Sequence, residues 1–195
     1  MAKQTKGKQG GGKVSAKTQT TTVRKQTPMH SMMEKLFMDQ LKSLYYMEKN
    51  QIRTLGRLAK KATTDELKDV LLEHQEITQE QLGRLDQVFE ILGKRAQVRK
   101  CPAFDGLVEE ADELLGDTEE DTLTRDVALI VSVQKIKHYE IAGYGCLTTL
   151  ARTYAMQEAA DWLQESLDEE KDMDQQLTYI AENNINYEAG LEEEE

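Results

Sequence analysis

Carboxylate and histidine side chains interrupt the apolar stripes of four long segments in this chain of 195 residues. A buried carboxylate persists only when it is protonated, paired or bound to a cation. Carboxylates and imidazoles that project inward from four helices are also the ligand set of a dinuclear, carboxylate-bridged metal centre. The sequence therefore predicts such a centre at mid-height of a helical bundle. The candidate ligands that interrupt the stripes are Glu48, His74, His138, Glu170 and Asp174.

Glu76 and Glu140 each follow a histidine by two residues. Two residues turn a helix by about 200°, so a histidine and the glutamate after it cannot both face one centre. We place His74 and His138 at the centre and rank Glu76 and Glu140 below them, as ligands only if the helices are rotated differently. The Glu-x-x-His spacing that dinuclear bundles usually carry does not occur in the sequence.

The same residues also fit a buried network that contains no metal. His74 and His138 would then hydrogen-bond to Glu48 and Glu170 inside the core. In that case the chain would be a structural or interaction module whose polar layer sets the register of the helices. The two hypotheses differ in one measurable property, the metal content of protein purified without a chelator.

Apolar residues recur at spacings of three and four in four segments, which indicates four amphipathic helices. Ser31 with Glu34, and Thr63 with Glu66, have the form of capping boxes, and Gly93 is a typical helix end. An antiparallel arrangement buries all four apolar stripes. The predicted fold is therefore all-α: a ferritin-like four-helix bundle with a short extra helix, around residues 104–115, in the link between two hairpins. The four long helices are expected at 31–62, 64–92, 122–154 and 157–183.

Charge divides the chain into three parts. The net charge of −11 combines a first stretch, residues 1–30, with seven Lys or Arg and no carboxylate, and a strongly acidic remainder. We therefore distinguish a basic arm (1–30), a bundle (31–186) and an acidic tail (187–195). The arm has little to bury, so it is expected to be flexible or to assemble a homo-oligomer, a dimer or larger, with residues 18–23 pairing as a strand. Nucleic-acid binding by the arm is less favoured, because the acidic body would oppose it.

Composition excludes several classes of protein. No segment approaches the roughly 18 apolar residues of a membrane span, and the N-terminus lacks the apolar core of a secretory signal. The two cysteines, Cys101 and Cys146, give neither a disulfide framework nor a thiolate zinc site. A cytoplasmic protein without membrane contact is expected.

Three segments of the chain resemble one known family. They are LLEHQEITQEQLGRLDQVFEILGKR (71–95), IKHYEIAGYG (136–145) and LQESLDEEKDMDQQLTYIAENNIN (163–186). These segments are similar to the YciE/YciF-type bacterial stress proteins of the ferritin-like superfamily. The resemblance implies a ferritin-like bundle, commonly dimeric, with an iron or manganese site. The ligands that it implies are Glu48, His74 or Glu76, His138 or Glu140, and Glu170.

Two positions depart from the pattern that this resemblance leads us to expect. Lys137 stands just before the third-helix histidine, where an acidic residue is expected, and Ile77 stands where many relatives are polar. Both residues lower the negative charge near the expected centre. They therefore argue against full occupancy by two metal ions.

The leading hypothesis for function combines the ligand set with the resemblance. A dinuclear iron or manganese centre would oxidise Fe(II) with oxygen or peroxide, as a ferroxidase- or peroxidase-like oxidoreductase, in stress protection or iron handling. The alternative is the non-enzymatic structural or assembly module. Whether the chain is an enzyme depends on which of these hypotheses holds.

Overall fold

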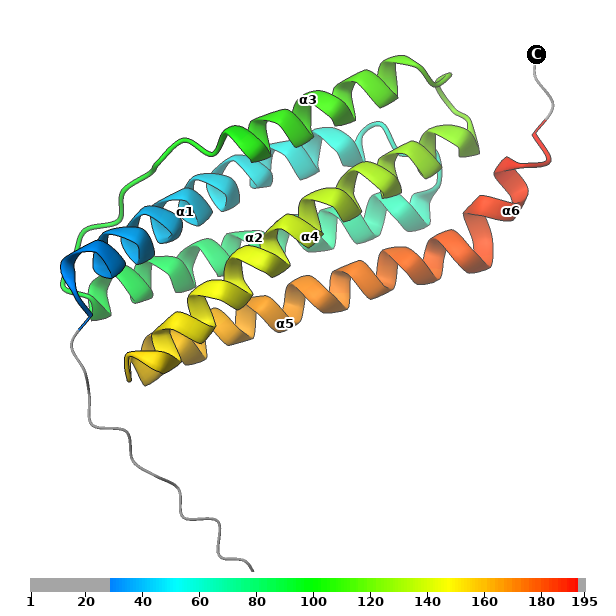
Figure 1. Cartoon of the computed structure of the whole chain (residues 1–195). Coiled ribbons are helices and arrows are strands. Elements are labelled where there is room, and N and C mark those ends of the chain that lie inside the picture. Colours follow the sequence, from blue (N-terminus) through cyan, green and yellow to red (C-terminus); the bar gives the residue numbers. More distant parts are fainter. Residues whose placement is uncertain (1–28, 193–195) are drawn as a thin grey trace, which may run out of the picture.

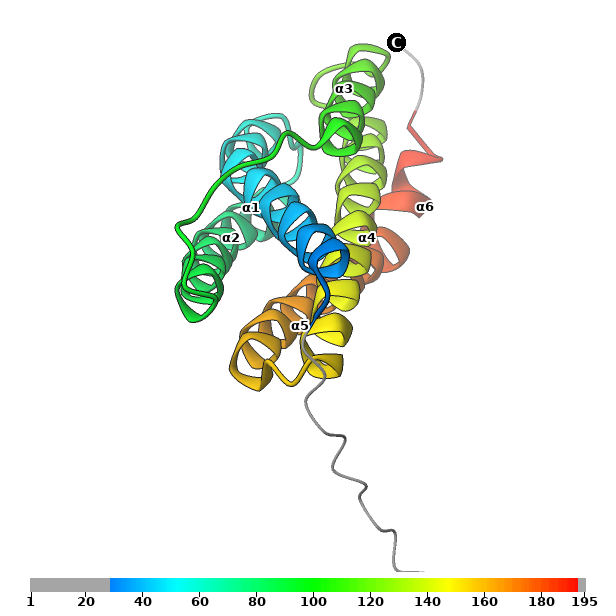
Figure 2. The ribbon, with the colours of Figure 1, turned by 60° about the vertical axis from the view of Figure 1, so that its left-hand side comes forward.

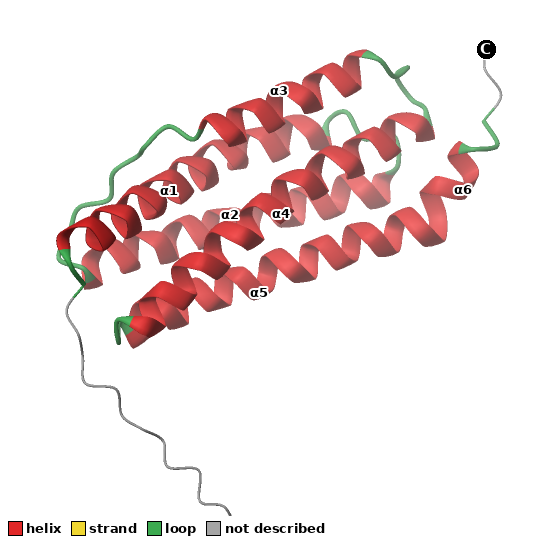
Figure 3. Ribbon diagram, viewed as in Figure 1, coloured by secondary structure: helices red, strands yellow, loops and turns green. Residues whose placement is uncertain are grey.

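The computed structural model describes residues 29–192. The predicted arm lies outside these residues except for its last two positions, and so do residues 193–195 of the predicted tail. Within the described range every regular element is helical (Figure 3). Among these helices, none combines the length and the apolar character that crossing a membrane requires. The elements are α1 (Ser31–Ala59), α2 (Asp65–Ile91), α3 (Pro102–Gly116), α4 (Leu123–Thr153), α5 (Gln157–Ile180), a π-helical turn (Ala181–Ile185) and α6 (Asn186–Ala189).

Two helical hairpins form the bundle, one from α1 and α2 and the other from α4 and α5 (Figure 1). α1 packs against α4 and α2 packs against α5, so the four long helices enclose a common interior (Figure 2). α3 lies in the connection between the hairpins and packs on α4. The all-α fold, the antiparallel bundle and the short extra helix that the sequence predicts are confirmed.

Apolar side chains fill the interior in two clusters. One cluster, nearer the start of α1, contains Phe37, Leu41 and Phe89 among others. The other, nearer the loop between α1 and α2, contains Leu58 and Leu67. Full burial of such a side chain stabilises the fold by about 1.5–3 kcal/mol, so these clusters decide which face of each helix turns inward. Polar side chains lie between the two clusters.

Asp126 fixes the α1–α2 loop to the start of α4. Its carboxylate accepts hydrogen bonds from the backbone nitrogens of Thr63, at 2.7 Å, and Thr64, at 2.9 Å. Thr64 is the N-cap of α2, so the cap that we predicted at Thr63 lies one residue further on. The capping box predicted at Ser31 is wrong, because α1 begins at Ser31 itself and the N-cap residue, His30, makes no side-chain cap bond.

Helical structure continues past α5 into the region predicted as an acidic tail. The π-helical turn joins α5 to α6, which ends at Ala189. The carboxylate of Glu192 then accepts hydrogen bonds from the backbone nitrogens of Leu123, at 2.6 Å, and Thr124, at 3.1 Å. A negative charge at a helix N-terminus is favourable, so this part of the tail caps α4.

Candidate metal centre

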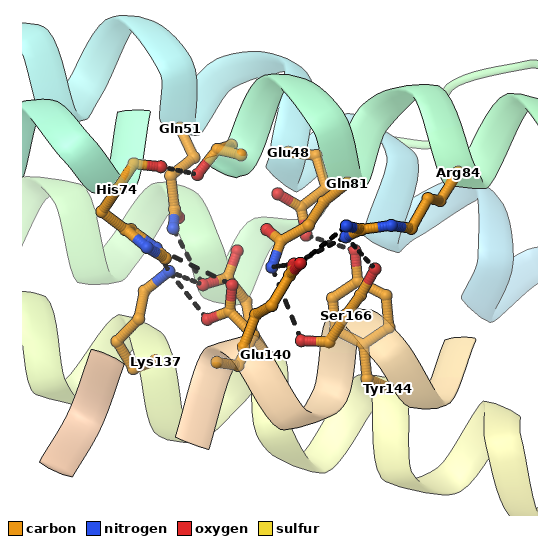
Figure 4. A network of polar contacts seen from close by, with 12 residues as sticks. Glu48, Gln51, His74, Gln81, Arg84, Lys137, Glu140, Tyr144 and Ser166 are labelled. Atoms are coloured by element: carbon orange, nitrogen blue, oxygen red, sulfur yellow. Dashed lines mark hydrogen bonds and ion pairs between the residues drawn. The ribbon is translucent and has the colours of Figure 1, made fainter. Parts of the chain in front are cut away.

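A polar layer crosses the bundle interior between the two apolar clusters (Figure 4). α1 contributes Glu48 and α2 contributes His74. α4 contributes Lys137 and Glu140, which are three residues apart and therefore project from the same face, and α5 contributes Glu170. All five side chains are fully buried. The layer thus contains three carboxylates, one ammonium group and one imidazole.

The three carboxylates lie close enough together to share one cation. One oxygen of each of Glu48, Glu140 and Glu170 lies within 4.8 Å of the other two. The hydroxyl of Tyr144 donates a hydrogen bond to Oε1 of Glu48 at 2.7 Å, and Nε2 of Gln51 donates to Oε2 of Glu140 at 2.8 Å. These two donors hold their carboxylates in fixed orientations.

Lys137 supplies a positive charge inside the layer. Its Nζ atom lies 2.6 Å from Oε2 of Glu140 and 2.8 Å from Oε2 of Glu170, and it also contacts Nε2 of His74. Burial by itself lowers the pKa of a lysine, but the charges of Glu140, Glu170 and Glu48 outweigh this effect and raise the pKa of Lys137 above its ordinary value. Lys137 is therefore a cation at physiological pH.

Burial also shifts the ionisation of the other groups in the layer. It raises the pKa of Glu48 to about 8, and the charge of Glu170 adds to this effect. Burial and the charge of Glu140 raise the pKa of Glu170 to about 8 as well, and burial raises the pKa of Glu140. Burial and the charge of Lys137 lower the pKa of His74 well below its usual range, so its imidazole is neutral.

Five buried polar atoms of the layer have no hydrogen-bond partner among the described residues. They are Oε2 of Glu48, Oε1 of Glu140, both carboxylate oxygens of Glu170, and Nδ1 of His74. Of the Glu170 oxygens, Oε2 lies 2.8 Å from Nζ of Lys137 and Oε1 lies 3.7 Å from Nε2 of His74. Such atoms are rare inside proteins, and each indicates a further partner such as a proton, a water molecule or an ion. The oxygens among them come from the three carboxylates that lie together, so the residues fit one cation bound by carboxylate oxygens.

A second polar cluster borders the layer and joins α2 to α5. Nη1 and Nη2 of Arg84 each lie 2.6 Å from an oxygen of Glu169. Nε2 of Gln81 donates a hydrogen bond to Oε2 of the same carboxylate at 3.0 Å. A bidentate arginine–carboxylate pair has a specific geometry, so this cluster fixes the position of the neighbouring residue, Glu170, on α5.

A cleft between α2 and α5 borders the layer at His74. Its volume is about 190 Å³, and its lining includes the buried His74 together with Glu73, Glu169 and Asp172. Glu73 and Asp172 are exposed. Acidic side chains at an opening raise the local concentration of cations. The cleft therefore places acidic side chains next to His74, one member of the layer.

Comparison with known proteins places the chain in a family. A family model described as "Domain of unknown function (DUF892)" matches residues 32–190. The chain belongs to this family. Protein YciF of Escherichia coli (strain K12) is 41% identical over 157 residues, which make up 80% of this chain and 94% of the relative.

Solved structures of two similar proteins show the same fold as this DUF892 chain. The E. coli stress protein YciF, at 41% identity, has a TM-score of 0.75 and covers 81% of this chain and 99% of its own. YcfI from Rhodopseudomonas palustris, described as a putative structural protein, has a TM-score of 0.73 at 35% identity, with coverage of 80% and 96%. The resemblance to YciE/YciF-type stress proteins that the sequence predicts is confirmed.

The DUF892 bundle brings most of the predicted ligands together. Glu48, His74 and Glu170 lie in the layer, and so does Glu140, which the sequence ranks below His138. The predicted inward position of His138 is wrong, because its side chain is 67% exposed. Glu140, two residues further on and on the opposite side of α4, takes the inward position instead.

Glu76 and Asp174 also lie away from the layer. Glu76 is exposed on α2. Asp174 is partly exposed on α5, where one of its carboxylate oxygens lies 3.5 Å from Nε2 of His138. This DUF892 chain therefore has a peripheral histidine–carboxylate pair between α4 and α5, separate from the three buried carboxylates.

The inward face of α4 differs from the predicted face by one residue. The sequence places His138 inward, whereas the structure buries Val133, Lys137 and Glu140. One residue corresponds to about 100° of helix rotation, which is enough to exchange His138 for Lys137 at the inward position. Lys137 is the member of the layer that the sequence reasoning missed, although its spacing of three from Glu140 was a usable signal.

Proposed function

We propose that this protein is a stress-associated bundle that holds a divalent iron or manganese ion between Glu48, Glu140 and Glu170. The observation that carries the proposal is that three buried carboxylates, one each from α1, α4 and α5, lie together, and each has an oxygen without a hydrogen-bond partner among residues 29–192. Carboxylate oxygens suit manganese among the first-row ions, and helical bundles with buried carboxylates hold iron or manganese.

The net charge of the layer also supports the binding of one divalent ion per chain. When all three carboxylates are ionised and Lys137 is protonated, the layer carries two net negative charges. An uncompensated buried charge is strongly destabilising, so two positive charges must enter. One divalent ion supplies both of them, without any change in the surrounding residues.

The neighbouring residues position the ligands. Each carboxylate has one oxygen held by a protein donor, from Tyr144, Gln51 or Lys137. Each carboxylate also has an oxygen that accepts no hydrogen bond within the described part of the chain and that can bind the ion. A bound iron ion would supply electron transfer to oxygen or peroxide. Keeping Fe(II) in this buried centre agrees with the description of the E. coli relative YciF as a stress protein.

A metal-free structural module is the second candidate, and the raised pKa values favour it. Because the pKa values of Glu48 and Glu170 are raised to about 8, two protons can neutralise the layer at pH 7 and leave Lys137 paired with Glu140. The description of the R. palustris relative as a putative structural protein agrees with this candidate.

Metal binding by purified protein separates the two candidates. The full chain, purified without a chelator and stripped by dialysis, is titrated with Mn(II), and separately with Fe(II) under anaerobic conditions. Bound metal per chain is then measured by elemental analysis after equilibrium dialysis. We expect metal in the wild type and none in the Glu48→Gln/Glu170→Gln double variant, because the amides keep the shape of the side chains and lose the charges.

The Glu76→Gln/Asp174→Asn double variant is the matched control. Like the first variant, it removes one carboxylate from the α1–α2 hairpin and one from the α4–α5 hairpin. Both of its positions, however, lie outside the layer. We expect it to bind as much metal as the wild type. A wild type that takes up no Mn(II) and no Fe(II) contradicts the metal proposal and leaves the structural module.

A further inference from the structure

We infer that the ammonium group of Lys137 holds the place of one cation in this centre, so that the chain has room for one divalent ion beside it. This inference rests on the proposed metal binding and specifies its stoichiometry. It differs from the dinuclear arrangement expected from the sequence, which has two metal ions and no internal ammonium group.

The contacts of Lys137 are those of a bound cation. Its Nζ atom lies between carboxylate oxygens from two helices, Oε2 of Glu140 on α4 at 2.6 Å and Oε2 of Glu170 on α5 at 2.8 Å. Nε2 of His74, a typical metal-ligand atom, contacts it from α2. Two carboxylates and one imidazole from three helices thus surround the ammonium group as ligands surround a metal ion.

A metal ion cannot share this position with the ammonium group. Transition metals bind nitrogen and oxygen ligands at about 2.0–2.2 Å, which requires the space that the Nζ atom now fills. The side chain of Lys137 is fully buried, at 0% exposure. It therefore cannot turn out to the solvent without moving the helices packed around it.

The three carboxylates around Lys137 also have oxygens available for a second cation. Oε2 of Glu48, Oε1 of Glu140 and Oε1 of Glu170 have no hydrogen-bond partner among residues 29–192. Glu140 and Glu170 therefore each present one oxygen to the ammonium group and keep the other one available. Such a pair of bridging carboxylates is the arrangement by which two neighbouring cations share ligands.

Replacing Lys137 with glutamate tests the inference. Residue 137 projects from the same face of α4 as Glu140, so Lys137→Glu adds a fourth inward carboxylate and removes the ammonium group. The layer then carries four negative charges, which two divalent ions neutralise. We expect one Mn(II) per chain in the wild type and two in Lys137→Glu, measured by equilibrium dialysis of the full chain.

Lys135→Glu is the matched control. It makes the same change of charge on the same helix, but at a residue whose side chain is 42% exposed and pairs with Glu110. We expect it to bind one Mn(II), as the wild type does. Electron paramagnetic resonance gives a second readout, with an isolated Mn(II) signal for the wild type and a spin-coupled pair for Lys137→Glu.

The numbers of Mn(II) ions bound by the wild type and by Lys137→Glu separate this inference from the proposed function. Equal Mn(II) counts in the wild type and Lys137→Glu, or two ions in the wild type, overturn the inference and leave metal binding intact. A wild type without metal overturns the proposed function. In that case the inference about Lys137 is still tested, because it requires Lys137→Glu to bind more Mn(II) than the wild type.

Anomalous diffraction from Mn(II)-soaked wild-type crystals tests the inference if Lys137→Glu does not fold. The inference requires one anomalous peak, with the Nζ atom still between Glu140 and Glu170.

Discussion

The Nζ atom of Lys137 lies 2.6 Å from Oε2 of Glu140, one helical turn further along α4, and both side chains are fully buried. On an exposed helix face the same pair would contribute only a few tenths of a kcal/mol. In the interior, the loss of one partner leaves the other as an uncompensated charge, which is strongly destabilising. The positive charge of Lys137 therefore stabilises the ionised form of the buried carboxylates around it.

Removal of the Lys137 charge should destabilise the metal-free protein. For Lys137→Met we expect the free energy of unfolding at pH 7 to fall by about 3–5 kcal/mol, because Glu140 and Glu170 lose their buried partner. Urea denaturation followed by circular dichroism measures the change. Lys135→Met, at an exposed position of the same helix, should change stability by no more than about 0.5 kcal/mol. A similar decrease in the free energy of unfolding in both variants would show that the buried ion pairs of Lys137 do not stabilise the fold more than the exposed pair of Lys135 does.

Glu48 and Glu170 should make the metal-free protein less stable as the pH rises. Their pKa values are raised to about 8 in the folded chain, from an ordinary value of 4.5. A group with a raised pKa stabilises the folded state fully below its unfolded pKa, and this contribution is lost as the pH rises through the folded pKa. We therefore expect the contribution of these two groups to the free energy of unfolding to decrease between about pH 5 and pH 9.

The Glu48→Gln/Glu170→Gln variant is the control for this pH dependence. Glutamine resembles a protonated glutamate and does not titrate, so the variant should show a flatter profile than the wild type. Both proteins are unfolded with urea at several pH values in the presence of a chelator. Parallel profiles would assign the pH dependence to other groups.

Metal binding should release protons and strengthen with pH. Near pH 7 Glu48 and Glu170 are mostly protonated, because their pKa values are raised to about 8, and both must ionise to bind an ion. We expect about two protons released per ion and an affinity for Mn(II) that rises up to about 100-fold per pH unit below pH 7. Calorimetry in two buffers with different ionisation enthalpies measures the released protons. An affinity that does not change with pH would place the ion outside this layer.

Deletion of residues 1–28 tests the predicted role of the basic arm in assembly. These residues lie outside the described part of the chain, so the prediction rests on their seven Lys and Arg and their lack of carboxylates. We expect the truncated protein to form a smaller oligomer than the full chain in light scattering after size-exclusion chromatography. An unchanged mass, together with a loss of salt-dependent binding to DNA, would favour the nucleic-acid role instead.

Much of the fold and part of the candidate site can be predicted from local sequence patterns. α1, α2 and α5 each have one apolar face, so the inward direction of Glu48, His74 and Glu170 follows from the spacing of their apolar neighbours. A carboxylate or histidine that interrupts such a face is recognisable because apolar residues flank it on the same face, as Leu44 and Leu55 flank Glu48. The helix boundaries follow from the same periodicity together with turn residues such as Gly93, whose φ of 65° is typical of a helix end.

The rotation of α4 and the partners of Lys137 depend on the tertiary structure. Apolar side chains occur around the whole circumference of α4, where Val131 is 40% and Tyr139 is 39% exposed, although Lys137 and Glu140 are buried. The local pattern therefore fits two rotations of this helix that differ by about 100°, and only its packing against α1, α3 and α5 selects one of them. Lysine is stable in this interior because Glu170 and His74 approach it from α5 and α2, and no spacing within α4 contains that information.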